Sequence, residues 1–139
     1  MTWAPTEVQK AVFATLNSDA TLTSLLGSNK VFDHVPDNTS YPYVSIFIFP
    51  FEDRGSYNTE GLTLVFQVST WVRGNTRGNL SVQTIQKRID ELLHKANLSI
   101  TGWKIISLRR DLIDLRTEDD NVTKQGIQRF RLLIGETHE

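Results

Sequence analysis

The sequence predicts an α+β domain, a mostly antiparallel sheet with a long helix and an N-terminal helical pair packed on one face. Two observations lead to this class. Apolar residues recur at helical spacing in three segments, and at strand spacing or in continuous runs in the others. The elements are also grouped as helix, helix, strands, helix, strands, and do not alternate regularly as in a parallel sheet. At 139 residues, the chain is expected to form one domain.

A pair of helices is predicted at the N-terminus. The first runs from Pro5 to about Asn17, and Pro5 suits the first turn because its missing N–H has no partner to lose there. Ser18 or Asp19 can cap a short second helix, and Gly27 would end it as the residue after the C-cap. The apolar positions of the pair are Val8, Ala11, Val12, Leu16, Leu22, Leu25 and Leu26.

Three strands are predicted next. Val31 to Val35 favours a short strand, and the loop after it lasts to Pro42. Tyr43 to Phe49 is apolar on both faces, which indicates a strand covered by a second layer or by a partner. Leu62 to Val72 alternates, as expected of a strand with one core face. The polar segment Glu52 to Gly61 is longer than a tight hairpin needs, so we expect an exposed loop that carries binding.

The longest helix is predicted from Asn79 to Ala96, after a basic, glycine-containing loop from Arg73 to Gly78. Two strands follow, Trp103 to about Leu115 and Gly126 to Ile134, with an acidic loop between them. Because helices must cover the apolar face of the sheet, the opposite face is expected to be polar. It would carry Gln67, Ser69, Arg129 and Arg131.

The composition argues against several function classes. Lys and Arg number 15 against 16 Asp and Glu, so no global field exists to hold a polyanion or an acidic membrane surface. Without cysteine there is no thiol nucleophile or thiolate metal site, and 3 histidines are few for zinc. No apolar run approaches the roughly 20 residues of a spanning helix, and no secretory signal is present. We therefore expect a cytoplasmic product with no cofactor, metal or membrane partner.

The adjacent residues Asp33 and His34 suggest a catalytic dyad. A hydrolase would need a nucleophile, an imidazole base and an orienting carboxylate that converge in space. Successive side chains of a strand point to opposite faces, so Asp33 would not orient His34. A structural role is favoured, and a small hydrolase stays as the last alternative. His94, near a helix end, is expected to interact favourably with the helix dipole.

Other charged groups and glycines form no specific motif. No glycine-rich phosphate-binding pattern occurs, and Glu118 to Asp120 lacks the ligand spacing of a calcium loop. Basic residues gather around the start of the long helix, at Arg73, Arg77, Lys87 and Arg88. They could contact phosphate, although such a patch on a near-neutral protein is usually solvated surface.

Five features occur in a fixed order along the chain. They are Leu25-Leu26-Gly27, "VFDHVPDNTSYPYVSI", "LTLVFQVSTWVRG", the amphipathic helix after it, and "GIQRFRLLIGE". This set resembles the tail completion or tail terminator family of long-tailed, siphovirus-like bacteriophages over almost the whole chain. The run "IFPFEDRGSYNTEG" departs from the family pattern, so no partner-specific role is carried over to it.

The resemblance implies a structural virion protein with a single tail-terminator-like domain at residues 1–139, and no enzyme. Such subunits form a ring, typically a homo-hexamer, at the head-proximal end of the tail tube after assembly in the bacterial host cytoplasm. The ring ends tube polymerisation and joins the tail to the head connector. The implied partners are other copies, the tail tube protein and head-tail connector proteins, while DNA only passes through the lumen. A head-tail connector or head-closure subunit is the alternative.

The candidate interface comprises two loops and the polar sheet face. We expect the loop after Glu52 to reach a neighbouring subunit or the tail tube. Part of the polar face is expected to border the lumen, with Arg129 and Arg131 balanced by carboxylates such as Asp111 or Asp114, since unpaired arginines would hold phosphate. The full set is Asp53, Arg54, Tyr57, Glu60, Gln67, Arg73, Arg77, Arg129 and Arg131. No catalytic, cofactor-binding or metal-binding residue is predicted.

Overall fold

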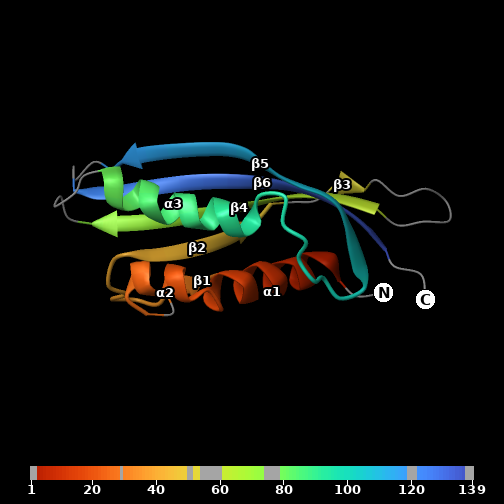
Figure 1. Cartoon of the computed structure of the whole chain (residues 1–139), viewed down its shortest axis with the longest axis horizontal. Coiled ribbons are helices and arrows are strands. Elements are labelled where there is room, and N and C mark those ends of the chain that lie inside the picture. Colours follow the sequence, from red (N-terminus) through yellow and green to blue (C-terminus); the bar gives the residue numbers. More distant parts are fainter. Residues whose placement is uncertain are drawn as a thin grey trace.

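The computed structural model describes residues 3–28, 30–49, 52–53, 61–73, 79–118 and 122–136. These residues form helices and strands that confirm the predicted α+β class (Figure 1). The elements are α1 (Ala4–Asn17), α2 (Ala20–Leu26), β1 (Val31–Phe32), β2 (Tyr43–Ile48), β3 (Glu52–Asp53), β4 (Gly61–Arg73), α3 (Asn79–Leu93), β5 (Trp103–Thr117) and β6 (Thr123–Glu136). No described helix is both long and apolar enough to cross a membrane.

All the described strands belong to one 6-stranded sheet. The order is β1-β2-β4-β6-β5, and β3 pairs with β4 outside this path. Neighbouring strands are antiparallel except for β1 and β2, which are parallel. Strands β1 and β5 therefore lie at the two edges, and β4 and β6 form the centre.

The three helices pack on the same face of the sheet (Figure 1). Val8, Val12 and Leu16 of α1 recur at helical spacing and are completely buried. They join one core with the alternate residues of the central strands, where the rings of Phe66 and Phe130 stack 5.4 Å apart. Because the period of a strand is two, the residues between these core positions point away from the helices.

Asp19 connects two of the helices. Its carboxylate caps α2 by accepting the Leu22 N–H at 2.8 Å, so Asp19 and not Ser18 is the cap. The same carboxylate accepts bonds from Nε and Nη2 of Arg88 on α3, at 2.9 and 2.6 Å. The bond from Arg88 lowers the pKa of Asp19 below its ordinary value. Arg88, one of the basic residues around the start of the long helix, is thus engaged in the fold.

The predicted strand from Val31 to Val35 is wrong in length, because β1 ends at Phe32. Asp33 Oδ1 accepts the backbone N–H of His34 at 2.8 Å. Such local side-chain bonds to the backbone compete with strand pairing. The chain therefore leaves the sheet at Asp33.

Two further boundaries differ from the prediction. The segment predicted as an exposed connection begins with β3, whose Glu52 and Asp53 pair with β4. The long helix ends at Leu93, and Lys95 then takes a φ of 60°, a left-handed conformation that cannot continue a helix. The chain after Lys95 turns back toward β5, where the Lys95 N–H donates to the Leu108 carbonyl at 3.0 Å.

Candidate functional site on the open face of the sheet

The face of the sheet opposite the helices, called the open face below, is not covered by any element in the described part of the chain. The strand register arranges its side chains in rows that cross four strands. One row holds Phe47, Gln67, Arg129 and Leu112. Another holds Tyr43, Trp71, Gln125 and Arg116. The register thus brings together residues that are far apart in the sequence.

A chain of hydrogen bonds runs along the centre of the open face. Arg129 Nε donates to Gln67 Oε1 at 3.0 Å, and Gln67 Nε2 donates to Ser69 Oγ at 3.0 Å. Gln125 Nε2 also donates to Ser69 Oγ, at 3.4 Å. These bonds fix the side chains in a partly buried layer, and each contributes roughly 0.5–1.5 kcal/mol in typical proteins.

An aromatic pair holds Arg129 from the other side. Its guanidinium lies 5.1 Å from the centre of the Phe49 ring, and the Phe47 ring meets Phe49 edge to face at 4.9 Å. Cation–π contacts of this kind are worth about 0.5–1 kcal/mol at exposed sites. Phe47 itself remains 57% exposed, so this apolar ring contacts solvent at the edge of the sheet.

A second aromatic group lies at the other end of β2. The rings of Tyr41, Tyr43 and Trp71 are in contact, with Tyr43 stacked on Trp71 at 6.3 Å. The Arg73 guanidinium lies 5.9 Å from the Tyr41 ring centre. Burial and the neighbouring Tyr41 raise the pKa of Tyr43, so its hydroxyl stays protonated at neutral pH. Both ends of β2 therefore place an arginine on an aromatic ring.

Arginines outnumber carboxylates among the described side chains of this face. Asp111 lies 3.6 Å from Arg131, and Asp114 lies 3.2 Å from Arg116. The Leu115 N–H, and then Arg116, lower the pKa of Asp114. Among the side chains that the structure describes, five arginines share the open face with these two aspartates, although the whole chain has a net charge of -1. The arginines are Arg73, Arg109, Arg116, Arg129 and Arg131.

The prediction that carboxylates balance the charges of Arg129 and Arg131 holds for one of the two arginines. The pairing of Arg131 with Asp111 is confirmed. The prediction for Arg129 is wrong, because this arginine bonds the neutral Gln67 amide and the Phe49 ring, and no described carboxylate lies within ion-pair distance. Asp114 is taken by Arg116, its neighbour two residues along the same strand.

The structure brings together Gln67, Arg129 and Arg131 of the predicted interface and places Arg73 at the end of the same face. Asp53 lies in β3 opposite Leu62, but its side chain falls outside the description. The remaining predicted residues also lie outside the described residues, so their roles stay predictions. They are Arg54, Tyr57, Glu60 and Arg77.

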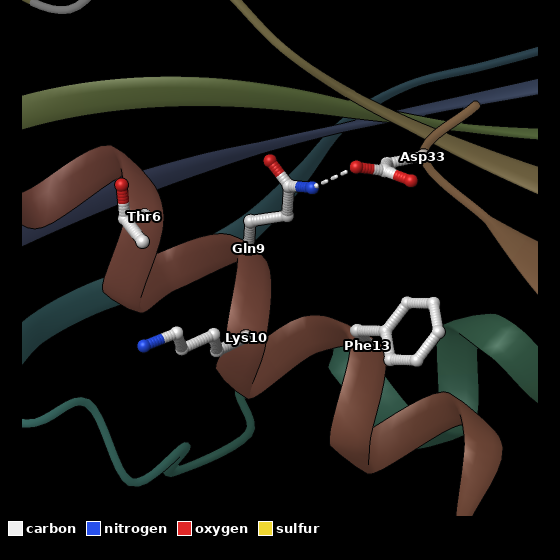
Figure 2. Close-up of a pocket in the computed structure, with 5 residues that line it drawn as sticks. All are labelled: Thr6, Gln9, Lys10, Phe13 and Asp33. Carbon is white, nitrogen blue, oxygen red and sulfur yellow. Dashed lines mark hydrogen bonds between the residues drawn. The ribbon is translucent and has the colours of Figure 1, made fainter.

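Asp33 and His34 do not form a catalytic dyad in the structure. Asp33 accepts the backbone N–H of His34 rather than its imidazole, and its other oxygen accepts Gln9 Nε2 at 2.9 Å. Figure 2 shows Gln9 reaching from α1 toward Asp33, with Phe13 further along the same helix. These residues line a shallow pocket of about 410 Å³. Asp33 therefore ties the end of β1 to α1.

The sequence interpretation missed the role of His94. Its Nδ1 accepts the backbone N–H of Arg110 at 3.0 Å. The expected interaction of His94 with the helix dipole stays a prediction. Together with the bond from Lys95 to Leu108, the contact of His94 with Arg110 covers the middle of the outer edge of β5. No local signal in the sequence links residues so far apart.

The described residues contain no group of three or more His, Asp or Glu side chains arranged to hold a metal ion. The groups that the fold concentrates are instead aromatic rings, arginines and amides on an uncovered sheet. Aromatic residues and arginine are the types enriched in protein interfaces. The arrangement is suited to contact with macromolecules.

Comparisons with known proteins show what this chain is similar to. A family model, tail completion protein gp17, matches residues 10–135. Tail completion protein gp17 of Bacillus phage SPP1 is 33% identical over an alignment of 139 residues, and this alignment covers 96% of this chain and 98% of the relative. The solved structure of bacteriophage SPP1 gp17 matches with a TM-score of 0.60 at 28% identity, covering 99% of this chain and 94% of that one. A chain in the virion of a native gene transfer agent particle has the same fold, with a TM-score of 0.86 at 19% identity, covering 97% and 99% of the two chains.

Proposed function

The chain belongs to the tail completion protein gp17 family, and we propose that it forms a ring at the head-proximal end of a phage tail tube. The ring, a homo-hexamer in this proposal, ends tube polymerisation and joins the tail to the head connector. Its partners are further copies of the chain, the tail tube protein and connector proteins of the virion. This assembly role requires binding surfaces and no catalytic step.

The observation that carries the proposal is the uncovered open face. One face of an antiparallel sheet can contact water when its side chains are polar. Here that face also carries Phe47, 57% exposed, and Leu112, 40% exposed, at its two edges. Arginines held by rings and amides lie between them. A subunit with this surface is suited to assembly, because exposed apolar groups rimmed by polar residues mark interaction sites.

We further propose that part of the open face borders the lumen through which DNA passes. Arg131 is balanced by Asp111, whereas the charge of Arg129 is not compensated by a described carboxylate. Arg129 would then make weak contacts to passing phosphates without reading the base sequence. The segment after Asp53 is proposed to reach a neighbouring subunit or the tube, as expected from its sequence.

Negative-stain images of the purified protein, alone and with tail tubes, test the function. Rings on one end of each tube, and tubes that stop growing after the protein is added, are the expected result. Binding to DNA-filled capsids but not to tubes would favour the head-closure alternative. A protein that stays monomeric and binds neither tubes nor capsids would contradict the proposal.

A further inference from the structure

We propose that the sheet continues from one copy of the chain to the next, with the outer edge of β5 paired to the outer edge of β2 of its neighbour. The inference rests on the proposed ring and names the contact that closes it. Its partner is a second copy of this chain. The argument uses the two sheet edges and the register between them.

The first edge is the C-terminal half of β5. The turn after α3 covers Leu108 and Arg110, but residues 111–117 make no backbone-to-backbone hydrogen bond to any described segment except β6. Their backbone is bonded by side chains at two points, where the Leu115 N–H donates to the Asp114 carboxylate and the Asp114 carbonyl accepts Gln86 Nε2. Leu112 and Ile113 on this half are 40% and 48% exposed, and successive residues of a strand point to opposite faces. An open edge with exposed apolar side chains is a template for another strand.

The second edge is the end of β2. Strand β1 pairs only with Val44 and Ser45, so Ile46 to Ile48 have β4 on one side and no described strand on the other. Ile46 is 4% exposed because its side is covered by the helices, whereas Phe47 on the open face is 57% exposed. The open-face side chain of Phe47 is therefore accessible beside a backbone edge that no described strand pairs.

The strand register shows which residues of the two edges belong to the same row. On the open face, the row from Phe47 through Gln67 and Arg129 ends at Leu112. On the helix face, the next row begins at Ile46, passes through Val68 and Gln128, and ends at Ile113. Each row thus begins and ends with an apolar residue. If a second copy continues the rows, Leu112 lies beside Phe47 and Ile113 lies beside Ile46. Aliphatic and aromatic cross-strand pairs of this kind stabilise sheets.

The strand directions fit a closed ring. Three antiparallel steps lead from β2 through β4 and β6 to β5, so β2 and β5 run in opposite directions. A neighbour in the same orientation would therefore add an antiparallel pair, like the rest of the central sheet. The contact is head-to-tail, because the two edges differ, and head-to-tail contacts generate rings when the rotation closes. The open face then lies on the same side of every copy.

Cross-linking tests the contact, because the chain contains no cysteine. The variant carrying Phe47→Cys and Leu112→Cys is assembled on tail tubes and oxidised, or treated with a short bis-maleimide. A ladder of covalent oligomers on a denaturing, non-reducing gel is expected. The matched control pairs Phe47→Cys with Ile106→Cys, since Ile106 is also exposed on β5, at 58%, but lies outside residues 111–117. This control should give less than a tenth of the cross-linked product.

A charged edge provides a second test that needs no cross-linker. Leu112→Lys should abolish rings in images and light scattering while the monomer keeps its circular dichroism spectrum. Ile106→Lys should leave the rings intact.

The outcomes distinguish a failure of the proposed contact from a failure of the proposed ring. Rings that form normally with Leu112→Lys, or that give no ladder with the cysteine pair, would overturn the continued sheet and leave the ring proposal standing. A covalent dimer from Leu112→Cys alone would show β5 paired with β5 and would also overturn it. If the unaltered chain forms no ring on tubes, both proposals fail.

Discussion

Asp19 has two tasks in the fold, and removing its carboxylate should cost more stability than a surface change. It caps α2 through the Leu22 N–H and holds Arg88 of α3 by two short bonds. Loss of such a cap costs typically about 1 kcal/mol. Hydrogen bonds to charged groups contribute about 1.5–3 kcal/mol when well shielded. The Asp19 and Arg88 side chains are only 14% and 30% exposed, so the bonds are partly shielded.

We expect Asp19→Ala to lower the free energy of unfolding by about 2–3 kcal/mol, because Arg88 can regain water at its exposed side. For a domain of this size the melting temperature should fall by roughly 8–12 °C. Asp19→Asn keeps an N-cap oxygen and loses the charge, so about half of this effect is expected. Glu91→Ala is the matched control. It removes the 3.7 Å contact of Arg88 with a residue that is 51% exposed, and it should change stability by less than about 0.5 kcal/mol.

Urea unfolding at several pH values checks both the size and the cause. The pKa of Asp19 is lowered in the folded chain, so its stabilisation is present above the ordinary carboxyl pKa. The contribution is lost as the pH falls through the lowered value, because both states then bind the proton. The difference between the unaltered chain and Asp19→Asn should therefore shrink below about pH 4. A loss under 0.5 kcal/mol, or a difference that is constant down to pH 2, would refute the reasoning.

Four further changes test other parts of the structure. His94→Ala removes the acceptor of the Arg110 N–H, so hydrogen exchange at that amide should become at least tenfold faster, and an unchanged rate would contradict the edge-covering role. Gly126→Ala should destabilise by about 1–3 kcal/mol in thermal unfolding, because side-chain atoms of α3 lie 2.6 to 2.9 Å from the added Cβ. Arg129→Gln should leave the melting temperature within about 3 °C and speed DNA ejection if this face borders the lumen, whereas slower ejection would count against that placement. His34→Ala should complement a phage that lacks this gene, and a folded variant that yields no infectious particles would show a need for the imidazole.

Local periodicity was sufficient to predict most helices and strands. The helical spacing of Val8, Val12 and Leu16 corresponds to the buried side of α1, and Gly27 has the positive φ of 89° that a residue after a C-cap requires. The alternation along β4 and β6 placed Gln67 and Arg129 on the same kind of face. These features depend on the geometry of one segment, which the sequence of that segment controls.

The order of the strands and the partners of the charged groups required the tertiary structure. Alternation in β6 shows that Arg129 points away from the core, but it cannot show whether a carboxylate or Gln67 lies opposite. Arg88 meets Asp19 across 69 positions, and His94 meets Arg110 only because the chain turns back after Lys95. A strand's register depends on contacts with its neighbours, and a shift of one residue would exchange its two faces.

The sequence alone therefore determined the α+β class, the apolar faces and the family resemblance, because each depends on patterns within single segments and on their order along the chain. The tertiary structure alone decided that the row from Phe47 ends at Leu112 and that residues 111–117 lie at an open edge. The strand order decides which strand lies at an edge and which residues share a row. This order depends on the packing of the whole core. The surfaces for assembly follow from that order.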